Sequence, residues 1–432
     1  MPHENPSQTA QTAGTATLEA VGTVALLHDQ LAALADTAPS AGTDRRLADT
    51  MLRAAIGHVA SDIHIDPLES GVIIRFRING RLLDAASLRW DDAHRLINQI
   101  KTLAGIDPTA VFTPEDARWT HDVGEDKVDI RVSIAPCLRG PKLALRLLDR
   151  SRIELPLDQL GLEASDLVIL RDWLQGGAGM LICAGPTGSG KTTTLYALLR
   201  ELAHPARHII TVEDPPEYQL DGINQIAIDP RHGIDFPTAI RAVLRLDPDR
   251  VMLGEIRDPV TAHTAVEAAQ AGRTVLTSLH ASDTVATIAQ LRNWQLDDHS
   301  LAATLGLTIA QRRVPVLCQQ CREETKLDPS QQRWLSSHGL AEPTQTFTTR
   351  GCHHCAGTGV TGCRGLFELW LASGDERDAI RCGIDSKDLR RLLQRRQHRG
   401  LVSQGLAAVN AGEIALDHLR GCALPISSSH QE

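Results

Sequence analysis

The sequence is poor in aromatic residues, which make up 3% of its 432 positions, and it has no excess of positive charge. A nucleic-acid surface built on stacked rings is therefore poorly supplied, and the formal net charge of −9 argues against broad binding to DNA or RNA. No window approaches the roughly 18 to 20 consecutive apolar residues that cross a bilayer. No basic segment followed by an apolar core opens the chain, as it would in a signal peptide. We therefore expect a cytoplasmic protein, and its length predicts two or three domains.

The most specific pattern is a glycine-rich phosphate-binding loop that matches G-x-x-x-x-G-K-[ST] at every fixed position. A buried strand is predicted at 180–184 and a helix after the loop, so backbone N–H groups and a helix N-terminus would face an anion. Lys191 is expected to reach the β- and γ-phosphates of ATP, and Thr192 to hold Mg²⁺. The candidate nucleotide-binding residues are Gly185, Pro186, Thr187, Gly188, Ser189, Gly190, Lys191, Thr192 and Thr193.

Carboxylates follow two further predicted strands. The strand at 208–212 runs into Glu213 and Asp214, and the strand at 251–254 runs into Glu255. In an open α/β sheet, ligands bind at the carboxyl ends of the strands. We expect Glu255 to orient the attacking water, and Glu213 and Asp214 to order Mg²⁺ through its waters. The alternative is that these carboxylates cap helices.

A fourth strand is predicted at 274–279, and His280 closes it. This histidine is a candidate sensor of the γ-phosphate, with a purely structural role as the alternative. Helices are predicted at 261–271 and 284–294. The alternation of strands and helices predicts a mostly parallel sheet that is covered by helices on both faces.

The region before 150 predicts a separate, small α+β domain. A helix is expected to begin near Arg45 and to end near 61–67, and a strand is expected at 72–78 with a hairpin turn at Asn79–Gly80. Arg75 and Arg77 alternate with apolar residues, so both would point off one face of this strand. That face is either solvated or supplies phosphate contacts to a nucleotide held by another domain or subunit. Further elements are expected at 91–103 (helix), 128–132 and 143–148 (strands).

Four of the nine cysteines form two C-x-x-C pairs that are separated by thirty residues. Four thiolates in a tetrahedral array select Zn²⁺ and leave no open coordination position, so a structural site is expected. Such a site would contribute on the order of 10 kcal/mol of local folding free energy. The predicted zinc ligands are Cys318, Cys321, Cys352 and Cys355.

With these residues in place, the chain resembles the ATPases of type II secretion and type IV pilus assembly (GspE/PilB-like) over about residues 45 to 420. The motifs that carry the resemblance occur in the family's order. They are Ala-Ser-Asp-Ile-His-Ile at 60–65, Arg-Phe-Arg-Ile-Asn-Gly at 75–80, the phosphate loop, an aspartate box at 211–215, a Walker B region at 247–258 and a histidine box at 277–280.

The resemblance implies a RecA-like P-loop core in a hexameric ring, with ATP between this core and the small N-terminal domain. Arg75 and Arg77 would then approach the phosphates. Tetracysteine zinc subdomains occur in the assembly ATPases and are absent from retraction motors, which favours pilus or pseudopilus assembly over retraction. The implied partners are an inner-membrane platform protein and a membrane-anchored recruiting protein, with the ring at the cytoplasmic face of the inner membrane.

The chain departs from the family's usual residues at Phe112, Leu246 and Arg273. A nucleotide-gated assembly factor that does not hydrolyse ATP therefore stays open as an alternative, as does a nucleic-acid translocase. A basic helical run at 387–399 is either a solvated face or a contact for anionic lipid. The predicted division is a flexible leader (1–43), an α+β domain of PAS-like fold (44–149), a linker (150–160), a RecA-like core (161–315), a zinc subdomain (316–372), a C-terminal helical part (373–424) and a tail (425–432).

Overall fold

The computed structural model describes residues 46–78, 80–109, 113–123, 126–149, 155–355 and 357–422. The predicted leader (1–43) and tail (425–432) lie outside the described residues. The first part of the predicted linker, 150–154, and Asn79 of the predicted hairpin turn also lie outside them.

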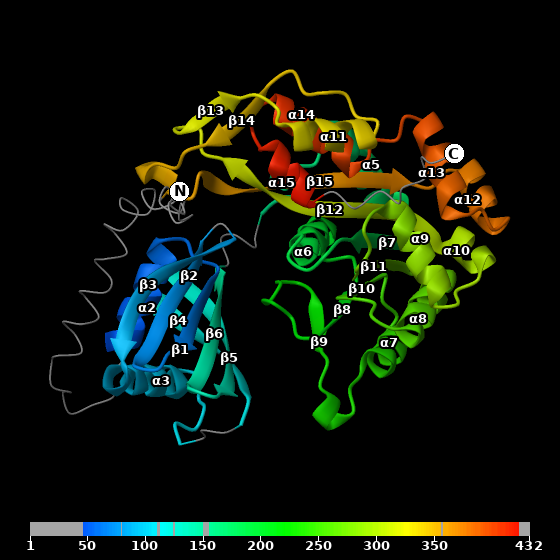
Figure 1. Ribbon diagram of the computed structural model, residues 1–432. Helices are drawn as coiled ribbons and strands as arrows, with labels where there is room; N and C mark the ends of the chain where they lie inside the picture. Colours follow the sequence, from blue (N-terminus) through cyan, green and yellow to red (C-terminus); the bar gives the residue numbers. More distant parts are fainter. Residues whose placement is uncertain are drawn as a thin grey trace, which may run out of the picture. The chain divides into compact units, whose positions relative to one another are not determined.

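The chain divides into two compact units, and the first contains the residues up to 150 together with 317–323 and 348–362. Its main element is a six-stranded antiparallel sheet in the order β3-β2-β1-β6-β5-β4 (Figure 1). Two amphipathic helices, α2 and α3, bury their apolar sides in the same core as the sheet. The elements are α2 (Arg46–Gly57), β1 (Asp62–Pro67), β2 (Gly71–Ile78), β3 (Arg81–Arg89), α3 (Trp90–Leu103), β4 (Glu115–Val123), β5 (Asp126–Cys137) and β6 (Gly140–Asp149).

Residues 62–67 form strand β1, so the prediction that a helix ends there is wrong. Helix α2 ends at Gly57, and β1 pairs with both β2 and β6. Ile63 and Ile65 are fully buried, while the polar residues that flank them face the other side of the sheet, which is the period of a half-buried strand. The elements predicted at 72–78, 91–103, 128–132 and 143–148 are confirmed as β2, α3 and parts of β5 and β6.

The second unit is built on a seven-stranded sheet in the order β15-β12-β7-β11-β10-β8-β9. From β12 to β9, neighbouring strands run parallel, as the alternation of strands and helices predicts. The four strands that were predicted are β7, β8, β10 and β11; the other three were not predicted. The strands are β7 (Gly179–Ala184), β8 (Ile209–Glu213), β9 (Asn224–Ala227), β10 (Arg250–Leu253), β11 (Thr274–Leu279), β12 (Leu305–Leu317) and β15 (Val360–Leu371).

Helices cover both faces of this sheet, because successive residues of β7 enter two different cores. Met180 and Ile182 belong to one core with α7 to α10, α12 and α13, whereas Leu181 and Cys183 belong to the other with α5 and α6 (Figure 1). The sheet is therefore buried on both sides. The helices are α5 (Ala164–Gly176), α6 (Lys191–Leu202), α7 (Phe236–Leu244), α8 (Pro259–Gln270), α9 (Thr284–Asn293), α10 (Asp298–Thr304), α12 (Gly374–Arg381) and α13 (Ser386–Arg395).

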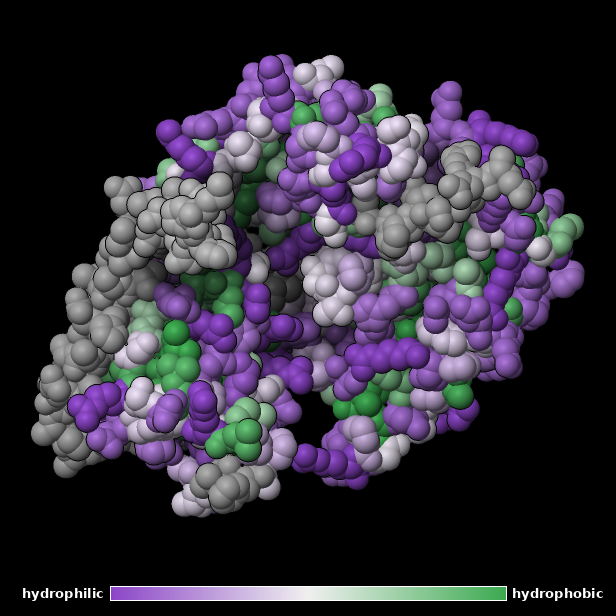
Figure 2. Space-filling model, in the orientation of Figure 1, coloured by the Kyte–Doolittle hydropathy of each residue, from purple (hydrophilic) through white to green (hydrophobic). Residues whose placement is uncertain are grey.

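A third and smaller core joins the long strands β12 and β15 to three more helices. These are α11 (Pro329–Ser337), α14 (Leu401–Asn410) and α15 (Leu416–Cys422). Across the described ranges, no helix combines the length and the apolar character needed to cross a bilayer. On the face drawn in Figure 2, hydrophobic residues appear as separate areas among hydrophilic ones.

Candidate functional site

The phosphate loop joins the buried strand β7 to helix α6, in the strand–loop–helix order that its sequence predicts. A Cβ atom at Gly185 would lie 2.4 Å from Ser189 Oγ and 2.6 Å from the carbonyl oxygen of Gln311, so only glycine fits there. Gly190, the residue before α6, has a φ of 96°, which glycine adopts without steric cost. These glycines let the loop curl tightly before α6, whose first N–H groups are available to an anion.

Lys191 is the first residue of α6, and its ammonium group lies over the loop. Nζ donates to the carbonyl oxygens of Gly185 at 2.9 Å and Pro186 at 3.2 Å. Burial lowers the pKa of Lys191, and the nearby Glu255 carboxylate partly opposes that shift. Because neutral carbonyls are weaker partners than anionic oxygens, phosphate oxygens would be the stronger acceptors for this ammonium group.

The strand order places His280 between the phosphate loop and Glu255. Strand β11 pairs with β7 on one side and with β10 on the other. The N–H of Gly185 bonds to the last residue of β11 at 3.3 Å, and the N–H of Ile256 donates to the carbonyl of Ser278 at 2.9 Å. The ends of three strands thus meet at one edge of the sheet, as the positions of the polar residues predict.

Four ionisable side chains form a connected group at this edge. His280 Nε2 lies 2.6 Å from Glu255 Oε1, and Arg257 Nε lies 3.0 Å from Glu255 Oε2. Arg257 Nη1 also lies 3.2 Å from Asp214 Oδ2, so this arginine bridges two strand ends. The Glu255 side chain is only 17% exposed, whereas Asp214 and His280 are 43% and 49% exposed. The Glu255 carboxylate is therefore fixed by two contacts and largely shielded from water. It lies beside Asp214 and His280, which a ligand can reach.

Two polar residues of this region, Arg257 and Gln311, have no role in the sequence-based prediction. Arg257 is visible two positions after Glu255, but its bridging contact depends on the order of the strands. Gln311 lies on β12, next to β7, where it is 1% exposed and donates from Nε2 to the carbonyl of Ser189 at 2.9 Å. No sequence signal points to Gln311, because β12 was not predicted.

Glu213 lies inside the protein, with 3% of its surface exposed. Its carboxylate accepts hydrogen bonds from the Tyr196 hydroxyl, from Thr211 Oγ1 at 2.6 Å and from Gln225 Nε2 at 3.1 Å. Burial and this carboxylate raise the pKa of Tyr196. The acidic group that the structure leaves accessible at the end of β8 is therefore the adjacent Asp214. A water-mediated contact between Glu213 and Mg²⁺ stays a prediction.

Arg75 and Arg77 lie in the first unit and point off the same face of β2, each about one-third exposed. Arg75 Nε donates to Asp66 Oδ2 at 2.8 Å, and Arg77 Nε lies 3.7 Å from Asp62 Oδ2. Each aspartate also contacts a second cation on β6. In this group of contacts, four cations therefore share two carboxylates. The cations are Arg75, Arg77, Lys142 and Arg146, and the carboxylates are Asp62 and Asp66.

The four cysteines of the two C-x-x-C pairs come together, and their sulfur atoms all lie within 4.8 Å of one another. Cys318 Sγ lies 3.7 Å from Cys352 Sγ, and Cys321 Sγ lies 3.8 Å from Cys355 Sγ. Tetrahedral coordination with Zn–S bonds of about 2.3 Å requires sulfur–sulfur distances of about 3.8 Å. This four-cysteine cluster therefore has the spacing and the ligand type of a structural zinc site.

Backbone N–H groups also point at these sulfurs. The N–H groups of Cys352 and Gly359 each donate to Cys355 Sγ at 3.2 Å. Burial raises the pKa of the Cys355 thiol, but these hydrogen bonds outweigh burial and bring it down to about 7. A thiolate stabilised in this way is the form that binds a metal ion. These two N–H donors thus favour the metal-binding form of Cys355.

The fold and site together define a class of protein. A parallel sheet covered on both faces, with a phosphate loop after β7 and carboxylates at the ends of β8 and β10, is a RecA-like P-loop NTPase core. The smaller antiparallel α+β unit and the four-cysteine cluster accompany this core. The predicted fold class is confirmed.

The chain belongs to the Type II/IV secretion system protein family, whose family model matches residues 38–420. It is 36% identical to type II secretion system protein E from Aeromonas hydrophila over 375 residues, which are 87% of this chain and 74% of that protein. It is 35% identical to type II secretion system ATPase E from Vibrio cholerae serotype O1 over 374 residues, again 87% and 74% of the two chains. The predicted family and the prediction of an ATP-hydrolysing enzyme are confirmed.

A solved structure agrees with this fold. The X-ray structure of the Legionella pneumophila ATPase DotB has a TM-score of 0.63 and covers 89% of this chain and 97% of its own. Its sequence identity to this chain is 22%, so the likeness concerns the fold alone.

Proposed function

We propose that this chain is the hexameric ATPase motor of a type II secretion pseudopilus or type IV pilus, at the cytoplasmic face of the inner membrane. The observation that carries the proposal is the convergence of Lys191, Glu255 and His280 at one edge of the sheet, in a chain of the secretion ATPase family. The motor would act on an inner-membrane platform protein and would be recruited by a membrane-anchored protein. Names of relatives in secretion systems support these partners.

The site residues take distinct roles in this proposal. Lys191 and backbone N–H groups at the end of the phosphate loop and the start of α6 bind the β- and γ-phosphates, as in other P-loop enzymes. Glu255 orients the attacking water, and its contact with His280 supports a role for the imidazole at the γ-phosphate. Arg257 contacts both Glu255 and Asp214 and so fixes the two carboxylates relative to each other. Glu213 supports this edge from inside through Tyr196 and Thr211.

The available oxygen donors fit Mg²⁺, which prefers hard oxygen ligands and keeps several waters. Thr192 lies exposed in the first turn of α6, and the Asp214 carboxylate is accessible. These two residues would hold the ion. When bound, it neutralises charge on the β- and γ-phosphates. The four-cysteine cluster would hold Zn²⁺. This ion would have a structural role, because four thiolates leave no coordination position open.

Arg75 and Arg77 are proposed to reach the phosphates of a nucleotide across a domain or subunit boundary. Their contacts support this, because two aspartates are shared among four cations and neither arginine has a carboxylate to itself. An arginine supplied across a boundary contributes roughly 10³ to 10⁵ in rate. If a phosphate oxygen replaced the aspartate as acceptor, the arginine would still be paired with an anion.

The basic run at 387–399 offers less free charge to anionic lipid than its sequence suggests. Four of its cations contact carboxylates of the second unit. We therefore propose that lipid contact is secondary to contact with protein partners. The paired cations are Arg390, Arg391, Arg396 and Arg399.

Glu255→Gln in the full-length chain tests the proposal. This change keeps the shape of the side chain but removes its charge, so hydrolysis should fall by roughly 10²- to 10⁴-fold while ATP still binds. Phosphate release and ATP binding should be measured together, and the mass of the ATP-bound variant in solution should be that of a hexamer. If the wild-type protein hydrolyses ATP no faster than Glu255→Gln, the protein is not a motor.

A further inference from the structure

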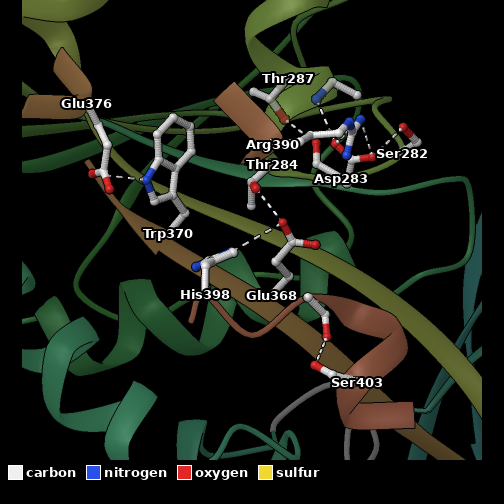
Figure 3. Close-up of polar contacts among 12 residues, drawn as sticks. Ser282, Asp283, Thr284, Thr287, Glu368, Trp370, Glu376, Arg390, His398 and Ser403 are labelled. Atoms are coloured by element: carbon white, nitrogen blue, oxygen red, sulfur yellow. Dashed lines mark hydrogen bonds and ion pairs between the residues drawn. The ribbon is translucent and has the colours of Figure 1, made fainter. Parts of the chain in front are cut away.

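Polar side chains, most of them buried, contact the loop that follows His280. Asp283 ends this loop and caps α9 by accepting a hydrogen bond from the N–H of Ala286 at 2.7 Å. Its two carboxylate oxygens also accept from Arg390 Nη2 at 3.0 and 2.9 Å (Figure 3). The Asp283 side chain is 9% exposed, and Arg390 belongs to α13 near the C-terminus. Helix α13 therefore contacts the end of the loop that follows His280.

A second connection lies one residue further along the chain. Thr284 is fully buried, and its hydroxyl donates to Oε1 of Glu368 on β15. His398, which follows α13, places Nε2 3.4 Å from the same oxygen, so Glu368 lies between the two (Figure 3). A buried carboxylate is costly unless it is paired in this way. The first turn of α9 is thus held by β15 and by the segment after α13.

A third connection runs from the loop to the phosphate loop. Arg312 on β12 donates from Nη2 to the carbonyl of Ser282 at 2.7 Å and from Nη1 to the carbonyl of Gln311 at 3.0 Å. Gln311 in turn donates to Ser189 in the phosphate loop. Residues 281–283 therefore lie between α13 on one side and the strand that supports the phosphate loop on the other.

We propose that Arg390 is a positioning residue that acts through Asp283 to fix His280 in its working orientation. The proposal rests on the proposed role of His280 at the γ-phosphate. The His280 side chain is half exposed, so its direction depends on the backbone that carries it and on its contact with Glu255. A displacement of α13 would therefore change the rate of ATP hydrolysis without touching the bound nucleotide. The C-terminal helices become a place from which a partner can control turnover.

A double-mutant cycle in the full-length protein tests this inference. Arg390→Ala, His280→Ala and the double variant should be compared with wild type for kcat, for KM of MgATP and for the affinity of a non-hydrolysable ATP analogue. We expect Arg390→Ala to lower kcat by roughly 10- to 100-fold, the range caused by a misplaced catalytic group. The KM and the analogue affinity should stay within about twofold, and Arg390→Ala should cause no further loss when His280 is already alanine.

Arg391→Ala is the matched control, because Arg391 lies next to Arg390 on α13 but pairs with Asp388 of the same helix. It should leave kcat unchanged. Arg390→Lys keeps a cationic donor for Asp283 and should recover most of the activity. Asp283→Asn keeps the cap of α9 while it removes the charge, so it tests the same contact if Arg390→Ala fails to fold.

The outcomes separate this inference from the proposed function. Additive losses in the cycle, or a wild-type kcat for Arg390→Ala, would overturn the inference while His280 keeps its role. An Arg390→Lys variant as impaired as Arg390→Ala would overturn it as well. If His280→Ala itself hydrolyses ATP at the wild-type rate, the role of His280 fails and the inference fails with it.

Discussion

The phosphate-binding edge of the sheet and the four-cysteine cluster are assembled in opposite ways. At the sheet edge, Lys191, Glu255 and His280 follow three separate strands, and the pairing of those strands sets their spacing. In the cluster, two short turns deliver four sulfurs, which form a small core of their own. The first site therefore depends on the fold around it. The second site would hold its own surroundings together when the proposed zinc ion is bound.

Cys321→Ser should have the largest effect of the changes considered, and it should affect the four-cysteine cluster while the phosphate-binding edge stays intact. Cys321 is 2% exposed, and its loss removes one of four ligands, so on the order of 10 kcal/mol of local folding free energy should be lost. Hydrogen exchange should become fast at 317–323 and 348–362, and the zinc content per chain should fall to about zero by elemental analysis. Binding of ATP to the phosphate loop should stay within about twofold.

Cys363→Ser is the control for this change, since Cys363 is exposed and lies outside the cluster. It should leave the zinc content and the exchange pattern unchanged. A Cys321→Ser protein that keeps its zinc, or that loses ATP binding together with zinc, would contradict the contrast between the two sites.

The same contrast explains what the sequence can predict. The cysteine spacing identifies the ligands directly, because each C-x-x-C pair brings two sulfurs together within one turn. The phosphate loop is equally visible, because all its chemistry lies in ten consecutive residues. The bridging role of Arg257 is not visible, since it depends on β8 and β10 being neighbours in the sheet.

Local patterns also fail where a polar residue serves the interior. Glu213 sits at a strand end like Glu255, yet it is buried and bonded to Tyr196, while Glu255 lies at the edge. Residues 62–67 carry alternating apolar residues that indicate a strand, but the helix before them hides that signal in the sequence. For Glu213 the deciding fact is which side of the strand end faces the core, and sequence spacing alone does not give it.

Arg257→Gln should have the second largest effect, and it acts on the sheet edge alone. The change removes the cation that joins Glu255 to Asp214, so the carboxylate that is proposed to orient water loses one of its two partners. We expect kcat for ATP hydrolysis to fall by roughly 10²-fold, with zinc content unchanged. Steady-state phosphate release against ATP concentration measures this effect.

A matched control exists at the opposite end of the same sheet. Arg273 lies just before the amino end of β11 and pairs with Asp247 at 2.8 Å. Arg273→Gln breaks an arginine–aspartate pair of the same kind but far from the carboxyl ends of the strands, so kcat should not change. Equal losses in the two variants would show that the ion pairs act only through general stability.

Gln311→Leu should have the smallest effect. It tests how much ATP binding depends on an uncharged hydrogen bond to the phosphate loop. Leucine fills a similar volume but leaves the Ser189 carbonyl without its donor, so the phosphate loop loses a hydrogen bond of about 1 kcal/mol. The Kd for ATP, measured by titration calorimetry, should then rise roughly fivefold. The kcat at saturating ATP should stay close to wild type, because Glu255 and His280 keep their contact. Gln270→Leu removes an exposed amide contact with Ser300 and should leave the Kd unchanged. If Gln311→Leu binds ATP like wild type, the shape of the phosphate loop is set by its own glycines and by strand pairing, without support from β12.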